Sequence, residues 1–141
     1  MNDNLDNPTI CPFRINGKLL GQMRSHVEQL APEEACGLVA GTSINALAVL
    51  PMTNLLHSPV RYRIDPAEQL QAFNDIDQQG WQLLAIYHSH PHGPAYPSET
   101  DIREAYYPEA VYLIWSILDG QWQLGAFKIQ DSSVTRLTLP T

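Results

Sequence analysis

An apolar run that ends in two histidines constrains the fold of this chain more than any other feature of its sequence. Residues 81–87 are followed directly by His88-Ser89-His90, and then by a segment rich in proline and glycine. A short apolar run before turn-forming residues is typical of a buried strand. Side chains two residues apart on a strand point to the same face, so both imidazoles can reach one metal ion.

The segment after the histidines supplies a third ligand. Ser98 comes just before a helix-like pattern, and Asp101 follows it by three positions. A helix capping box, worth about 1 kcal/mol, explains these two residues without a metal, but it explains neither histidine. Because Asp101 can turn back toward the strand end, we expect His88, His90 and Asp101 to bind a metal ion.

Three nitrogen or oxygen ligands leave one position of a zinc ion open, which is the form of a catalytic site. Zinc in such a site lowers the pKa of its bound water to about 7. Hydrolysis also needs a carboxylate near that water to pass its proton to a leaving amine. Glu34, at the start of a short apolar segment, is the candidate; Glu33 and Glu34 could instead be solvated residues at a helix end.

Other polar residues receive simpler interpretations. His92 would share a face with the two ligand histidines only if the strand continued through Pro91, which proline disfavours. We interpret His26 and His57 as surface histidines without a role, and Cys36 as a small buried residue. A further pair, Arg61 and Arg63, either forms a solvated strand face or holds a substrate carboxylate.

Composition narrows the class of protein. With 141 residues, 44% hydrophobic and 16% charged, we expect a single compact domain over 1–141, with 1–12 as a loose lead-in. The net charge of −7 argues against binding to nucleic acid or to an anionic membrane. Two cysteines outside any CxxC pair, with no secretory signal and no apolar run of about 18 residues, indicate the cytoplasm.

Hydrophobic periodicity predicts an α/β fold. Helices are expected over 19–30 and from Pro66 onward, the second with Asp65 as its N-cap and Leu70, Phe73 and Ile76 on one face. Strands are expected near 13–15, up to Gly41, and over 45–52, 60–64, 81–90, 110–118, 122–129 and 134–139, the last three antiparallel.

The combined motif resembles that of the JAMM (MPN+, Mov34/MPN/PAD-1) metallopeptidases. It consists of His88-x-His90-Pro, then Ser98-x-x-Asp101, with Glu34 before a glycine-bounded strand upstream. In its length and its Glu-Ala-Cys-Gly-Leu run the chain is most similar to the small stand-alone prokaryotic members. The resemblance spans roughly residues 13 to 130.

The resemblance implies a role for each motif residue. His88, His90 and Asp101 match the zinc ligands of the family, and Glu34, the second of the two acids, matches its general acid/base. Ser98 matches the serine that helps to stabilise the oxyanion of the tetrahedral intermediate. The implied fold is a curved mixed β-sheet with flanking helices, similar to the cytidine deaminase-like α/β architecture.

The activity implied by the resemblance is hydrolysis of an amide or isopeptide bond at the C-terminal tail of ubiquitin or a ubiquitin-like protein. In bacteria the partner is a sulfur-carrier protein, from whose diglycine tail an amino acid is released. The chain is too short for the long insertions with which deubiquitinating relatives grip linked ubiquitin. The sequence leaves the carrier and the oligomeric state open.

Three other functions are alternatives to a peptidase. A noncatalytic binding module, as in metal-free members of the fold, would be expected to lack the ligands, which are all present here. Nucleobase deamination also uses zinc and a glutamate, but it needs a Pro-Cys-x-x-Cys run that this chain lacks. The RadC-like branch of the family begins its motif with His-Asn-His-Pro-Ser-Gly, from which Ser89 and His92 depart.

Overall fold

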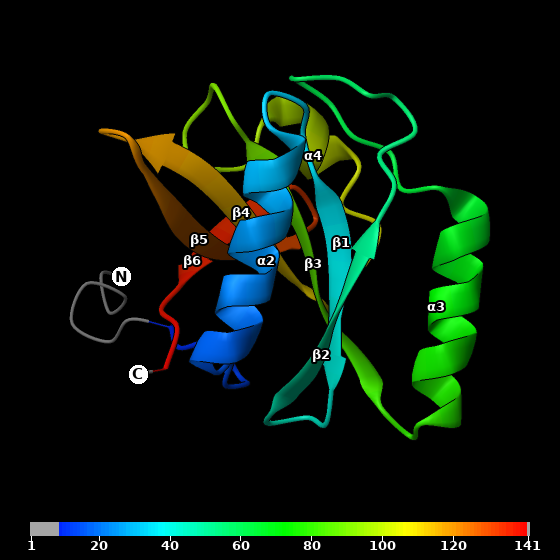
Figure 1. Ribbon diagram of the computed structural model, residues 1–141. Helices are drawn as coiled ribbons and strands as arrows, with labels where there is room; N and C mark the ends of the chain where they lie inside the picture. The colour runs from blue at the N-terminus through cyan, green and yellow to red at the C-terminus, as the bar shows by residue number, and fades with distance from the viewer. Residues whose placement is uncertain (1–8, 141) are drawn as a thin grey trace.

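The computed structural model describes residues 9–140 and shows a six-stranded sheet with helices packed against it (Figure 1). The elements are helix α2 (Gly17–Leu30), strands β1 (Cys36–Gly41) and β2 (Ala46–Met52), helix α3 (Pro66–Gln78), strand β3 (Gln82–His90), helix α4 (Glu99–Arg103), and strands β4 (Val111–Leu118), β5 (Gln121–Gln130) and β6 (Ser133–Leu137). No helix within 9–140 is long and apolar enough to cross a membrane. The predicted α/β class is confirmed.

The strand that ends in the two histidines lies inside the sheet, whose order is β2-β1-β3-β4-β5-β6. β3 pairs antiparallel with β1 and parallel with β4, and the remaining neighbours are antiparallel. The predicted antiparallel order of the last three strands is therefore confirmed. Because parallel neighbours need a crossover, the chain between β3 and β4 must return across the sheet, and this crossover carries α4.

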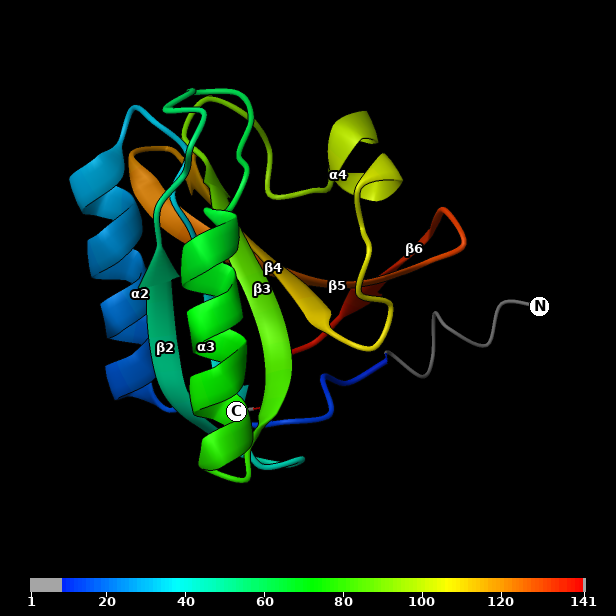
Figure 2. The same cartoon turned by 90° about the vertical axis from the view of Figure 1, so that its right-hand side faces the viewer.

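Helices α2 and α3 cover opposite faces of the sheet (Figure 2). Asn16 caps α2, and its side chain accepts a hydrogen bond of 2.9 Å from the backbone of Leu19. The buried stripe of α2 packs in one core cluster with Tyr87 of β3. The neighbouring residue on β3, Ile86, packs in the other cluster with Ala72 of α3.

This alternation decides where the histidines point. Tyr87 and Ser89 face the α2 side of the sheet, whereas Ile86, His88 and His90 face the other side, which α3 and α4 flank. The sheet thus separates the residues that anchor the strand end from the residues that can bind a ligand.

The helix α3 begins as predicted and buries a different stripe. Asp65 caps it and Pro66 stands in its first turn. Ala72 and Ile76 are buried, but Leu70 is 63% exposed, so the prediction that Leu70 shares one face with Ile76 is wrong. At about 100° per residue, Leu70 lies about 120° around the helix from Ile76, which turns it toward solvent.

The predicted strand over 60–64 is also wrong. In this segment only Ile64 makes an isolated bridge, to Asn54. The backbone of Arg61 and Arg63 bonds instead to the side chain of Asn54, at 3.0 and 3.1 Å. Because a buried side chain satisfies these backbone groups, the segment needs no neighbouring strand.

The first residues that the structure describes are bonded to residues near 138. Part of the expected loose lead-in over 1–12 lies outside the described residues, but Cys11 is buried and its backbone donates 2.7 Å to Thr138. The strand expected over 13–15 is reduced to one isolated bridge at Arg14.

Candidate metal centre

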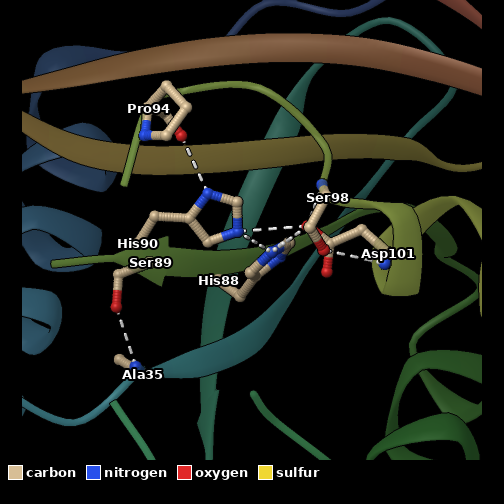
Figure 3. Close-up of polar contacts among 7 residues, drawn as sticks. All are labelled: Ala35, His88, Ser89, His90, Pro94, Ser98 and Asp101. Carbon is tan, nitrogen blue, oxygen red and sulfur yellow. Dashed lines mark hydrogen bonds and ion pairs between the residues drawn. The ribbon is translucent and has the colours of Figure 1, made fainter. Parts of the chain in front are cut away.

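Three predicted ligand atoms converge at the carboxyl end of β3 (Figure 3). Nε2 of His88 lies 3.0 Å from Nε2 of His90, and each lies 3.1 Å from Oδ2 of Asp101. His88 is 1% exposed and His90 is 8% exposed. The strand and the start of α4 therefore form a small triangle of nitrogen and oxygen atoms.

The triangle has about the size of one face of a tetrahedral zinc site. With zinc bonds of about 2.0–2.1 Å, neighbouring ligands lie about 3.3 Å apart. Nδ1 of His90 lies 2.8 Å from the carbonyl of Pro94, which can only accept, so in the neutral ring that a metal ligand requires this nitrogen carries the proton and Nε2 keeps its lone pair. Nitrogen and oxygen lone pairs packed this closely are satisfied by a cation.

A capping box at the start of α4 places Asp101. Oγ of Ser98 accepts a hydrogen bond of 3.0 Å from the backbone N–H of Asp101. In return, Oδ2 of Asp101 accepts one of 2.9 Å from the backbone N–H of Ser98. The same Oδ2 faces both histidines, so the helix cap and the ligand cluster share one atom. Burial opposes the ionisation of Asp101, but hydrogen bonds from His88 and His90 hold its pKa well below the usual range.

The net pKa shifts of the two histidines have opposite signs because their partners differ. It lowers the pKa of His88 below its usual value. For His90 burial also lowers the pKa, but the hydrogen bonds to Asp101 and to the Pro94 carbonyl outweigh it, so the net shift is upward.

Glu34 lies beside the triangle. One ligand atom each of Glu34, His88 and His90 lie within 4.8 Å of one another, so this group too could hold a metal ion. Glu34 is 4% exposed, and burial raises the pKa of its carboxyl group to about 8, with His90 opposing the shift and Asp101 adding to it. A carboxyl group with this pKa can hold or release a proton near neutral pH.

The backbone around Glu34 is held from three sides. Its N–H donates a hydrogen bond of 2.8 Å to the carbonyl of Ser58, and its carbonyl accepts one of 3.0 Å from the side chain of Asn54. The next residue, Ala35, donates 2.8 Å to Oγ of Ser89 (Figure 3). Ser89 could have been found in the sequence, because the alternation that aligns the two histidines turns it to the opposite face; Asn54 left no such signal.

Tyr62 is a further neighbour of the cluster that sequence reasoning missed. Its ring stacks on the ring of His88 with centroids 4.4 Å apart and planes 24° from parallel. The alternation over 60–64 separates Tyr62 from Arg61 and Arg63, but it does not indicate a contact with His88.

A cavity of about 260 Å³ adjoins the cluster. Its lining is largely apolar, and the residues that matter for the site are Glu34, Pro59, Val60, His90, Tyr96 and Ser98. His92 is exposed and also lines this cavity, but it does not belong to the group of converging ligand atoms.

The remaining candidates lie apart from the site or are buried. Oε1 of Glu33 lies 3.4 Å from Nδ1 of His57 at the surface. Cys36 is fully buried, as predicted, and is the cross-strand partner of His88 in the pairing of β1 with β3. Of the two acids that the sequence offered, Glu34 is the one that the structure brings to the histidines.

Among known proteins, the chain is 36% identical over 130 residues to the CysO-cysteine peptidase of Mycobacterium tuberculosis, covering 90% of this chain and 89% of that protein. Over 88 residues it is 46% identical to the probable TtuB-protein conjugate cleaving protease of Thermus thermophilus, covering 62% of this chain and 59% of the other.

The fold agrees with solved structures. The protein DSY2949 from Desulfitobacterium hafniense matches with a TM-score of 0.82 and 34% identity over 91% of both chains. AF2198 of Archaeoglobus fulgidus, a JAB1/MPN domain protein, matches with a TM-score of 0.59 at 15% identity, covering 92% of this chain and all of that one, and supports the fold alone. The family model of the prokaryotic homologs of the JAB domain matches residues 17–127. The chain therefore belongs to the family of prokaryotic homologs of the JAB domain.

Proposed function

We propose that this protein is a zinc-dependent peptidase or isopeptidase that hydrolyses an amide bond at the C-terminal tail of a ubiquitin-like protein of the sulfur-carrier type. The observation that carries the proposal is the convergence of His88, His90 and Asp101 on one point, with Glu34 beside them. The relatives named for cleaving a CysO-cysteine bond and a TtuB-protein conjugate support the class of substrate.

His88, His90 and Asp101 would hold the zinc. Imidazole nitrogen and carboxylate oxygen are ligands that zinc accepts, and three of them leave a position open. When bound, zinc would supply Lewis acidity that lowers the pKa of water to about 7 and polarises the scissile carbonyl. The capping box keeps Asp101 in place before any ion arrives, which reduces the entropy lost on binding.

Glu34 would move the proton. It takes a proton from the attacking water as the new C–O bond forms, and it gives that proton to the leaving amine as the C–N bond breaks. A cation beside it favours the carboxylate form, so its pKa falls from about 8 toward the range in which it can act as a base at neutral pH.

Ser98 would stabilise the developing oxyanion. Its oxygen accepts the capping hydrogen bond from Asp101, which leaves its hydroxyl proton available as a donor. Ser98 lines the same cavity as Glu34 and His90, so the donor faces the space that the substrate would enter.

The cavity suits a slender peptide. Its volume of about 260 Å³ lies below the range of about 300–1,000 Å³ that is usual for ligand pockets. An apolar lining near Val60 and Tyr96 favours residues without bulky polar side chains, such as the glycines at the end of a carrier tail. We place the reaction in the cytoplasm, where the free Cys11 and Cys36 stay reduced.

The test uses zinc-loaded protein and a sulfur-carrier protein conjugated at its C-terminus to an amino acid. Wild type should release the amino acid, whereas Glu34→Gln and His88→Ala should release at least about 100-fold less, given the size of general acid–base effects. Elemental analysis should find one zinc per chain in wild type and in Glu34→Gln, but none in His88→Ala. If wild type and Glu34→Gln release the amino acid equally, or if neither does, the chain is not such a peptidase and a noncatalytic binding role takes its place.

A further inference from the structure

The two histidines differ in how their rings are held. Nδ1 of His90 bonds to the carbonyl of Pro94 at 2.8 Å. Nδ1 of His88 is fully buried and has no hydrogen-bond partner among residues 9–140. A metal-binding histidine nearly always donates its second ring N–H, because that bond fixes the orientation of the ring. His88 therefore needs another means of orientation.

Tyr62 provides a surface against which this ring can lie. The two rings are 4.4 Å apart and nearly parallel, at 24°. On another side, His90 meets the His88 ring edge-on at 4.8 Å and 66°. Rotation of the imidazole about its Cβ–Cγ bond would drive ring atoms into the face of Tyr62, so the stacked geometry limits that rotation.

The backbone holds Tyr62 at this place. The residues before and after it, Arg61 and Arg63, bond to the side chain of Asn54 at 3.0 and 3.1 Å. We call these two hydrogen bonds the Asn54 clamp. Asn54 is 2% exposed, so its side chain is held in the interior. It is the ring of Tyr62 that contacts the ligand histidine.

We propose that Tyr62 is a positioning residue for the metal centre, whose ring orients His88 in place of the missing hydrogen bond to Nδ1. This inference rests on the ligand set of the proposed function and adds a determinant of metal affinity to it. Outer partners of ligand histidines typically change metal affinity by about 10- to 100-fold, and loss of the Tyr62 ring should fall in that range.

The test compares zinc affinities, measured by competition with a chromophoric chelator. Tyr62→Phe keeps the ring, whereas Tyr62→Leu and Tyr62→Met remove it but keep an apolar side chain. Tyr107→Leu is the matched control. Tyr62 and Tyr107 both line a second cavity, of about 280 Å³, but the ring of Tyr107 packs on the ring of Phe73, with centroids 6.0 Å apart, and not on a ligand histidine. Thermal unfolding without metal shows which variants fold.

Tyr62→Phe and Tyr107→Leu should bind zinc within about threefold of wild type, and Tyr62→Leu and Tyr62→Met about 10- to 100-fold more weakly. Nitrogen NMR of the histidine rings should show one fixed Nε2-bound form of His88 in zinc-loaded wild type and Tyr62→Phe, and exchange broadening in the ringless variants.

Wild-type affinity in a folded ringless variant, or equal losses in Tyr62→Phe and Tyr62→Leu, would overturn the role of the ring. Either result leaves the proposed function standing as long as wild type binds zinc and cleaves the conjugate. A wild-type protein that binds no zinc would instead remove the proposed function, so the two failures are distinguishable.

Discussion

The side-chain amide of Asn54 donates a hydrogen bond of 3.0 Å to the backbone carbonyl of Glu34. The same amide donates to the carbonyl of Arg61, and its oxygen accepts from the backbone of Leu56 and Arg63. All four hydrogen-bonding positions of this buried side chain are used. Asn54 therefore joins the residue proposed for proton transfer to the loop that supplies Pro59 and Val60 to the cavity beside the site.

Replacing Asn54 by Asp should destabilise the protein by about 2–4 kcal/mol. The change keeps the size and the acceptors, but it removes both donors, leaves the carbonyls of Glu34 and Arg61 without their partner, and buries a charge. Urea unfolding of the metal-free protein measures the effect.

Asn74→Asp is the matched control for this substitution, because Asn74 is exposed on α3. It should change the free energy of unfolding by less than about 0.5 kcal/mol. Equal effects of the two substitutions would mean that the clamp contributes nothing to stability.

Zinc should stabilise the folded protein through the triangle of ligand atoms. At a free concentration 100 times the Kd, it should raise the free energy of unfolding by about 2.7 kcal/mol, and chelation should reverse the gain. His88→Ala and Asp101→Ala should lose this response, since each removes a vertex. His92→Ala, at an exposed position, should keep it; a zinc response that disappears with His92 would contradict the ligand set.

Gly125→Ala should displace the loop that orients His90. A Cβ at Gly125 would lie 2.9 Å from the carbonyl oxygen of Ala95 and 2.8 Å from the ring of Phe127, which is closer than such contacts occur. Because Ala95 follows the Pro94 carbonyl that binds His90, we expect weaker zinc binding and a loss of about 1–3 kcal/mol of stability.

The same substitution at Gly21 gives the control for Gly125→Ala. Gly21 is exposed in α2, and nothing lies within 4 Å of an added Cβ. Gly21→Ala should therefore stabilise the protein by about 0.5–1 kcal/mol and leave zinc affinity unchanged. If both alanines weaken zinc binding, the close contact at Gly125 is not the cause.

His26 should make the protein less stable in mild acid. Its Nδ1 lies 2.7 Å from the hydroxyl of Tyr87, and burial lowers its pKa below the ordinary 6.5. A histidine whose pKa is lower in the folded than in the unfolded protein stabilises the fold at pH values above the unfolded pKa of about 6.5. This stability is lost as the pH falls from about 6.5 through the folded pKa. One such proton contributes a slope of at most about 1.4 kcal/mol per pH unit.

The measurement is the stability of the metal-free protein between pH 7 and pH 5. His26→Gln should flatten the pH dependence relative to wild type, and comparison of the two cancels the contributions of the other histidines. The exposed His92→Gln provides a control with the same chemical change. An unchanged slope in His26→Gln would show that His26 does not cause the acid sensitivity.

The strand that carries the ligands and the cap that follows it could both be predicted from local sequence. Alternation places His88 and His90 on one face, and Ser98 with Asp101 forms a capping box whose two members are only three positions apart. These features depend on neighbours in the chain, so the sequence alone contains them.

Where local patterns competed with distant contacts, prediction failed. Residues 60–64 alternate like a strand, but the side chain of Asn54 satisfies their backbone and leaves them outside the sheet. Leu70 has the spacing of a buried residue, yet the helix turns it to solvent. The first outcome depends on a distant side chain, which periodicity does not encode, whereas the second follows from the helical period, which puts Leu70 about 120° from Ile76.

The sequence by itself determined the fold class, the three residues whose ligand atoms converge and the acid beside them, because each is set by spacing along a strand, a helix cap or a motif. Only the tertiary structure decided how they are held: Asn54 binds the backbone of Glu34, Tyr62 stacks on His88, and a loop carbonyl orients His90. The first two contacts join segments 20 or more residues apart in the chain, which only the folded sheet brings together, whereas the third depends on how the loop after β3 folds back on the strand end.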